Sequence, residues 1–283
     1  MPSDYPELTP LTQISLADYH CHCDYSIDAI GSIDDYCRAA LQLGLVEICF
    51  TTHFDTNPAA GSGDCFIRID GEKRPATPDN FEVYVDHVHR AHEEFYPRGL
   101  SVKLGVEIGW WPGCLESVSG LLDRFDLDHV LCGIHEIYDR CICFDRFSQS
   151  FAHLTVDQFC REYFHQVKTA VHSGLFDAIA HLDYYVRFGH KHYGPVIHKA
   201  YAPYLNELFD SLKATDTALE INTSAIRHGF HQYYPSMAIL NSARRAGAAL
   251  RFLGSDAHRP EQVGLDFDAA AVLIPDRIVS REG

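Results

Sequence analysis

Asp18-Tyr-His20-Cys-His22-Cys-Asp24-Tyr-Ser-Ile-Asp28 follows the first predicted strand, an alternating run over residues 14–19 that continues into the two histidines. Side chains two residues apart on an extended chain point to the same face, so His20 and His22 can direct both imidazoles at one point. Cys21 and Cys23 then face the other way. Two neutral imidazoles at a rigid strand end form half of a site for zinc, manganese or iron. The alternative is a chance His-x-His in a chain with 18 histidines.

The composition limits the class of protein. A length of 283 residues with 46% hydrophobic residues fits one large domain or two small ones. The net charge is −16, from 23 basic and 39 acidic residues, and no basic run occurs. Affinity for a phosphate backbone is largely cationic, so a nucleic-acid surface is not expected. Small anionic substrates remain possible because bound metal ions supply local positive charge.

The sequence carries no sign of export or membrane insertion. The N-terminal stretch MPSDYPE is acidic without an apolar core, and no run of 18 apolar residues follows, so neither a signal peptide nor a membrane span is expected. Ten cysteines without a Cys-x-x-Cys pair are too few for a disulfide scaffold. Cys141-x-Cys143 is interpreted as a pair of ordinary buried thiols, with metal binding as the alternative. The cytoplasm is the expected compartment.

Seven strand-like runs alternate with helical patterns along the chain. The strands are predicted at 14–19, 46–50, 101–107, 128–135, 176–181, 218–222 and 249–255. The helices are predicted at 32–44, 78–96, 115–124, 157–173, 201–214 and 236–246, and residues 56–77 are predicted to form a long loop. Repeated βα units favour a parallel sheet. Seven such units predict a closed or nearly closed barrel that forms one domain over residues 1–283.

Histidines and carboxylates follow six of the seven predicted strands. They are His20, His22, His53, Glu107, His135, His181, Asp256 and His258. The carboxyl ends of the strands of a parallel barrel open onto one face, where active sites are built. Chance explains one or two such placements better than six. The sequence therefore predicts a metal site at the C-terminal ends of the strands.

The remaining histidines have weaker assignments. His87, His89, His92, His165 and His172 lie on predicted helices and are interpreted as surface or hydrogen-bonded groups. The histidine-rich segment 190–198, which includes His190, His192 and His198, stays unassigned. His228 and His231 follow the sixth strand, where loop residues can contact a substrate.

Six motifs carry a family resemblance. His20-x-His22 with Asp28, Thr52-His53, Gly105-Val-Glu107, Gly133-Ile-His135, His181-Leu-Asp183 and Ser255-Asp-Ala-His258 are similar, in this order, to the motifs of the PHP (polymerase and histidinol phosphatase) superfamily. The likeness covers nearly the whole chain. The stretches FTTHFD (50–55), HLDYYVR (181–187) and EINTSAIR (220–227), with Tyr234-Pro-Ser236, resemble the histidinol-phosphatase branch.

The resemblance implies an α/β fold, a distorted seven-unit (βα) barrel of the PHP type that holds two or three divalent metal ions. One ion would be bound by His20, His22, Glu107 and Asp256, a second by Glu107, His135 and His181, and a third by Asp28, His53 and His258. Zinc, manganese and iron all suit these ligands. Glu107, Asp256 and His258 are the expected catalytic residues. Arg187 and Arg227 match positions that bind phosphate in the branch.

The implied activity is hydrolysis of L-histidinol phosphate to L-histidinol and inorganic phosphate, in histidine biosynthesis, by a hydroxide that bridges two metal ions. Residues 138–143 and 187–198 depart from the branch, so a PHP-family phosphatase or phosphodiesterase that acts on another small phosphorylated metabolite is an alternative. A non-catalytic metal-binding PHP module, like those attached to polymerases, is an alternative of another class. The oligomeric state and the group that protonates the leaving alkoxide are not predicted.

Overall fold

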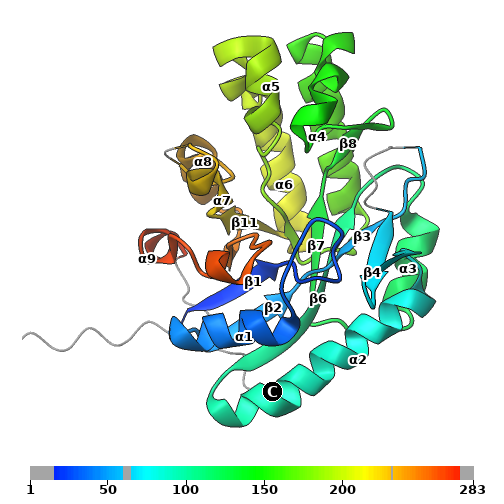
Figure 1. The fold of residues 1–283 in the computed structure, drawn as a ribbon. Helices are drawn as coiled ribbons and strands as arrows, with labels where there is room; N and C mark the ends of the chain where they lie inside the picture. Colours follow the sequence, from blue (N-terminus) through cyan, green and yellow to red (C-terminus); the bar gives the residue numbers. More distant parts are fainter. Residues whose placement is uncertain (1–15, 60–64, 231, 275–283) are drawn as a thin grey trace, which may run out of the picture.

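The computed structural model describes residues 16–59, 65–230 and 232–274, and its centre is a sheet of parallel strands (Figure 1). The strands are, in spatial order, β1 (Ala17–Cys21), β2 (Glu47–Phe50), β6 (Ser101–Gly109), β7 (His129–Gly133), β10 (Ala178–Ile179), β11 (Ala218–Asn222) and β12 (Leu250–Gly254). A short β3 (His53–Asp55) also pairs with β6. Spatial order thus follows chain order, as the repeated βα pattern predicts.

The first and last strands meet, so the barrel is nearly closed. The N–H of His22 donates to the carbonyl of Ala257 at 2.7 Å, one residue beyond the Cys21–Ala257 bridge. The buried Asp18 carboxylate adds a second link, accepting from the N–H of Ser255 at 3.0 Å and of Gly264 at 2.9 Å. The prediction of a seven-unit barrel is confirmed.

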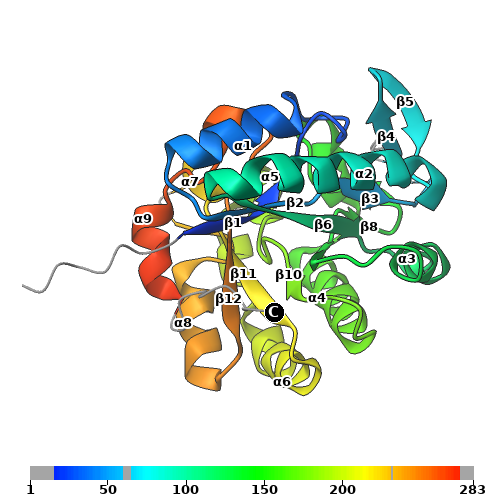
Figure 2. The same cartoon turned by 90° about the horizontal axis from the view of Figure 1, so that it is seen from below.

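Helices cover the outside of the barrel. The six predicted helices are present as α1 (Ile33–Gln42), α2 (Pro78–Phe95), α3 (Leu115–Leu122), α4 (Val156–His172), α6 (Leu205–Thr215) and α8 (Met237–Ala246). Figure 2 shows α1 and α2 along one side of β1, β2 and β6, whereas α4, α6 and α8 lie on the opposite side. Ser32 and Asp35 form a capping box at the start of α1, as their spacing predicts.

One prediction of irregular structure was wrong. Within the predicted loop 56–77, β4 (Phe66–Ile69) and β5 (Glu72–Pro75) form an antiparallel hairpin, visible at the upper right of Figure 2. Its two-residue turn is Asp70-Gly71, with φ of 51° and 80° at the two positions. Positive φ at both central residues defines the type I′ turn, for which Asp-Gly is a strong sequence signal. The many Pro, Gly and Ser residues nearby obscure that signal.

Several short elements surround the mouth of the barrel. They are β8 (Glu136–Ile137), β9 (Arg140–Cys141), η2 (Asp145–His153), α5 (Val186–Tyr193), η3 (Gly194–His198) and α7 (Ser224–Arg227). The segment 190–198, which the sequence left unassigned, is therefore helical. The remaining turns are η1 (Tyr96–Arg98), η4 (Ala202–Tyr204), η5 (Pro260–Gln262), α9 (Phe267–Ala270) and η6 (Ala271–Leu273). None of the helices in the described ranges is long and apolar enough to cross a membrane.

Small side chains fill the barrel interior. Leu131, Ala178, Ala180 and Ala218 form one buried cluster there. Toward the N-terminal ends of the strands, His129 packs its ring against Tyr19 and Phe252, with centroids 5.1 and 4.4 Å apart. At its other end β7 finishes at Gly133, and His135 lies two residues further along the chain. The packed interior thus separates two ends of the barrel with different chemistry.

Candidate metal centre

One cavity at the C-terminal ends of the strands brings the predicted ligands together. Its lining includes Asp28, His53, Glu107, His135, His181, Asp256 and His258, together with Cys143, Phe144 and Tyr184. His20 and His22 are fully buried and contact Glu107 and Asp256 from behind this lining. The nine residues therefore form one continuous cluster.

Four ligand atoms of this cluster face one point. The Nε2 atoms of His20 and His22 lie 2.9 Å apart. Glu107 Oε2 is 3.2 and 3.3 Å from these two nitrogens. Asp256 Oδ1 is 3.6 and 3.5 Å from the same two nitrogens. Ligands of a tetrahedral zinc ion at its usual bond lengths are about 3.4 Å apart, so this donor set fits a metal ion.

The Glu107 carboxylate has ligand groups on both sides. Its Oε1 lies 2.9 Å from His181 Nε2 and 3.2 Å from His135 Nε2, whereas Oε2 faces His20, His22 and His53, with His53 Nδ1 at 3.1 Å. Burial would raise the pKa of Glu107, but the facing histidines hold it well below its usual range. Glycine at 133 makes this arrangement possible, because a Cβ there would lie 2.3 Å from His135 Nε2 and 2.7 Å from Glu107 Oε1.

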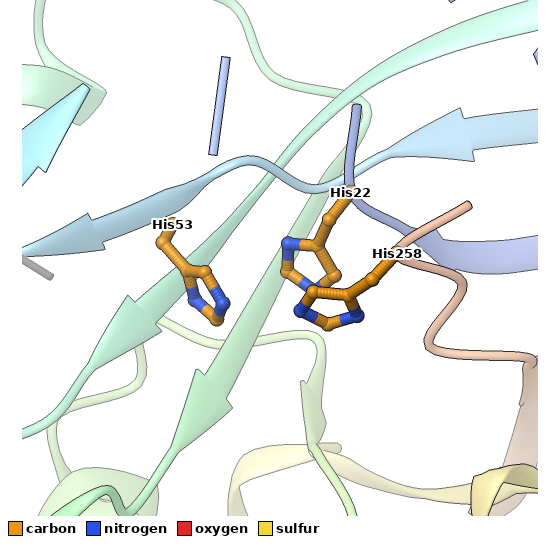
Figure 3. Close-up of side chains that lie close together, drawn as sticks. All are labelled: His22, His53 and His258. Atoms are coloured by element: carbon orange, nitrogen blue, oxygen red, sulfur yellow. The ribbon is translucent and has the colours of Figure 1, made fainter. Parts of the chain in front are cut away.

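A third group lies at the outer side of the cluster. Asp28 Oδ2 is 3.2 Å from His258 Nε2, and Asp28 Oδ1 is 3.9 Å from His53 Nε2. Figure 3 shows His22, His53 and His258 gathered from three separate segments of the chain. The ring of His22 is 4.2 Å from that of His53 and 4.5 Å from that of His258, centroid to centroid. The side chains that can share one ion overlap: the possible sets are His22, His53 and His258; His20, Glu107 and His181; His20, His22 and Asp256; and His53, Glu107 and His135. The division into three ions that the family resemblance implies stays a prediction.

Two of the predicted ligands have a strained backbone. His181 has φ of 31° and Asp256 has φ of 53°, in the left-handed region that residues other than glycine seldom adopt. Such conformations persist where the surrounding contacts hold them, and they concentrate at functional sites. Each residue lies two positions after the end of a strand, β10 for His181 and β12 for Asp256, and both line the cavity.

Buried carboxylates hold the ligand histidines from behind. Glu220 Oε1 lies 2.7 Å from His20 Nδ1, and Glu220 Oε2 accepts from the backbone N–H of His181 at 2.8 Å. Asp55 Oδ2 lies 3.2 Å from His135 Nδ1. A carboxylate on Nδ1 fixes the orientation of the ring and leaves Nε2 for the metal. Sequence analysis missed these roles, although a carboxylate inside the apolar strand β11 was a usable signal.

The comparisons with known proteins agree with this geometry. The model of the PHP domain matches residues 18–224. The chain belongs to the PHP domain family. A protein of Deinococcus radiodurans named probable histidinol-phosphatase is 32% identical over 92% of this chain and 93% of its own. The histidinol-phosphatase of Lactococcus lactis is 27% identical over 91% and 89%.

Solved structures agree with the fold. A crystal structure of histidinol phosphate phosphatase from Lactococcus lactis, in complex with zinc, L-histidinol and phosphate, has a TM-score of 0.74 at 24% identity and covers 93% of both chains. A structure from Listeria monocytogenes has a TM-score of 0.69 at 15% identity, over 90% of this chain and 99% of its own. The predicted membership in the histidinol-phosphatase branch of the PHP superfamily is confirmed.

The two arginines of this PHP domain lie beside the cavity. Arg187 Nη1 donates to the hydroxyl of Tyr184 at 2.5 Å, and Tyr184 lines the cavity. Arg227 donates from Nη1 to the carbonyl of Ser255 at 2.5 Å and from Nη2 to that of Asp256. Burial and the charge of Arg187 lower the pKa of His228 to about 3, so this imidazole is neutral.

Other predicted groups have separate positions. The helix histidines His87, His89, His92, His165 and His172 lie on α2 and α4, outside the cavity lining. His190 Nδ1 and His198 Nε2 face each other at 2.8 Å, and His192 packs on Tyr193. His231 lies outside the described residues. Cys141 is buried, as predicted, whereas Cys143 is half-buried and lines the cavity, a role that its sequence context did not indicate.

Proposed function

We propose that this PHP domain is a metal-dependent phosphomonoesterase that hydrolyses L-histidinol phosphate to L-histidinol and inorganic phosphate. The observation that carries the proposal is the buried Glu107 carboxylate, whose two oxygens face two groups of histidines in one cavity. The proteins named histidinol-phosphatase that align over nearly the whole chain support the substrate. The zinc, L-histidinol and phosphate in the Lactococcus lactis structure support the chemistry.

The donor set suits two or three divalent ions. One would be held by His20, His22, Glu107 and Asp256, one by Glu107, His135 and His181, and one by Asp28, His53 and His258. Imidazole and carboxylate suit zinc, manganese and iron alike, and zinc is the ion present in the Lactococcus lactis structure. When bound, such ions supply positive charge for the phosphate oxygens and make water more acidic.

The residues of the chain then position the ions and the substrate. Glu107, Asp256 and His258 are proposed as catalytic residues because they lie on the cavity wall where the reacting phosphate would sit. Arg187 and Arg227 lie beside that wall and are proposed to bind the phosphate oxygens, since a planar guanidinium offers paired donors that match a phosphate. The aromatic side chains of Tyr184 and Phe144 also line this cavity.

The test combines elemental analysis of the purified protein with turnover of L-histidinol phosphate and a panel of other phosphorylated metabolites. We expect bound zinc, manganese or iron, a preference for L-histidinol phosphate, and loss of activity after chelation that added metal restores. If L-histidinol phosphate is among the poorest substrates, another small phosphorylated metabolite is the substrate. If the metal-loaded protein turns over none of them, the domain is a non-catalytic metal-binding module.

A further inference from the structure

Arg68 binds a loop at the metal centre through both terminal nitrogens of its guanidinium group. Arg68 lies in β4, and its Nη1 donates to the carbonyls of Asp24, Ser26 and Ala29 at 3.0, 3.2 and 2.9 Å. Its Nη2 donates to the carbonyl of Ile27. Its backbone N–H donates to the carbonyl of Tyr25 at 2.8 Å. One residue therefore satisfies five carbonyls within six consecutive residues.

These carbonyls belong to an irregular segment. Residues 22–32 lie between β1 and α1 and form neither helix nor strand, so their carbonyls lack the regular partners of a helix or sheet. Of the five carbonyls that Arg68 bonds, that of Ser26 also accepts from the N–H of Ala29 at 3.3 Å. Ser26 and Ala29 are buried, which limits replacement of the lost bonds by water. A charged donor to several carbonyls is worth more than a neutral one. The guanidinium thus determines the path of this segment.

The same segment carries part of the metal centre. Ser26 Oγ lies 3.3 Å from His22 Nδ1 and accepts from the backbone N–H of His53 at 3.3 Å. Asp28 stands between Ile27 and Ala29, whose carbonyls both accept from Arg68. The side chain of Asp28 faces His258 and His53. A displacement of the segment would therefore move Asp28 away from its two histidines.

We propose that Arg68 is a positioning residue that holds Asp28 at the third group of ligands, so that the hairpin β4–β5 controls how tightly the outermost ion binds. The inference rests on the metal cluster proposed above. It assigns no contact between Arg68 and the substrate or an ion. Arg68→Ala should weaken binding of that ion about 10–100-fold, the usual effect of removing a group that orients a ligand.

The experiment compares three variants of the full-length, metal-loaded protein. Arg68→Ala removes the guanidinium, and Arg68→Lys keeps the charge with fewer directed donors. Arg74→Ala is the matched control, because Arg74 lies on β5 of the same hairpin and bonds only to the exposed Glu72 among the described residues. Metal content after dialysis, hydrogen exchange of residues 24–30 and activity against added metal are measured for each.

We expect Arg68→Ala to lose about one metal equivalent per chain and to exchange faster at residues 24–30. Added metal should restore its activity, and Arg68→Lys should fall between it and the parent, whereas Arg74→Ala should match the parent. In the background of Asp28→Asn, Arg68→Ala should remove no further metal.

Parental metal content and exchange in Arg68→Ala would overturn the proposal. So would a uniform loss of all metal with general unfolding in both Arg68→Ala and Arg68→Lys. Metal content and exchange do not depend on the substrate, so a wrong substrate assignment leaves this test intact.

Discussion

The two ends of the barrel use the same residue types for different purposes, and β7 shows both. His129 begins the strand, and His135 follows its end by two residues. Burial lowers the pKa of His129 to about 3, and its Nε2 has no hydrogen-bond partner among the described residues. For His135, burial lowers the pKa but Asp55 and Glu107 raise it well above its usual value. Position along the strand, rather than residue type, therefore separates a packing histidine from a ligand.

The balance of charge differs in the same way. At the N-terminal end, Lys103 Nζ lies 3.3 Å from Asp128 and 3.9 Å from Glu47, so cations and carboxylates satisfy each other. At the mouth, no lysine or arginine of the described ranges pairs with the carboxylates of Asp28, Glu107 or Asp256. Glu107 and Asp256 are buried, and buried carboxylates without such partners are costly unless a metal ion supplies the charge. The predictions below test this contrast.

The largest effect is expected for Glu107→Gln. The amide removes the charge and one acceptor from the group that faces both sets of histidines, so one of the two proposed ions loses its Glu107 ligand and the other keeps only a neutral amide oxygen. Turnover should fall by about a thousandfold or more, because bound ions contribute several kcal/mol to stabilising such a reaction. Metal content should fall as well. Glu47→Gln, at the opposite end, is the control and should keep its metal; near-normal turnover of Glu107→Gln would refute the bridging role.

The next effect concerns the arginines beside the mouth. Arg187→Ala and Arg227→Ala should each lower kcat/KM. The expected loss of transition-state binding is about 2–4 kcal/mol, by analogy with other preorganised donors. Metal content should stay at the parental level. Because Arg227 also holds the carbonyl of Asp256, a loss of metal in Arg227→Ala would instead indicate a purely structural role. Arg251→Ala, which removes an exposed arginine that pairs with Asp216 at the other end, is the control.

Much of this contrast was predictable from the sequence. The alternation through His20 and His22 and the regular return of strands place every predicted ligand except Asp28 at the mouth, because parallel strands share one direction. Asp28 was predicted only from the family resemblance. The hydrogen bonds of Glu220 were not predictable, since they join β11 to His20, 200 positions earlier in the chain. The hydrogen bonds of Arg68 were not predictable for a similar reason, because they join it to loop carbonyls that leave no pattern in the sequence. Local periodicity reveals strand ends, but not which distant side chains support them.

Glu220→Gln tests the support that the sequence did not reveal. The carboxylate accepts from both His20 and the backbone of His181, whereas an amide can accept at only one of its two positions. The Glu220 carboxylate fills the space beside Gly254, because a Cβ at Gly254 would lie only 1.9 Å from Glu220 Oε1. Glutamine keeps the size of the side chain and so fills the same space. Metal affinity should fall about 10–100-fold. Glu207→Gln, on the surface of α6, is the control, and unchanged affinity in Glu220→Gln would show that the histidines orient themselves.

The smallest effect belongs to His129, which should influence stability and not catalysis. Its folded-state pKa of about 3 lies below the ordinary value of 6.5, so the unfolded chain takes up a proton first as the pH falls. The stability contributed by the neutral imidazole is therefore fully present above pH 6.5 and is lost progressively between about 6.5 and 3. From pH 7.5 to 5.5 this loss amounts to about 1.4 kcal/mol.

His129→Leu removes that titration and keeps an apolar group against Tyr19 and Phe252. Urea unfolding of the metal-free protein at pH 7.5 and 5.5 measures the difference, because the other acid-sensitive groups titrate alike in both proteins and cancel. The variant should lose about 1.4 kcal/mol less than the parent on acidification, while turnover of the metal-loaded protein at pH 7.5 stays near the parental value. The exposed His165→Gln should show the parental pH dependence. If His129→Leu also showed the parental pH dependence of stability, or if it lost turnover while its metal content stayed intact, the two ends of the barrel would not be chemically separate.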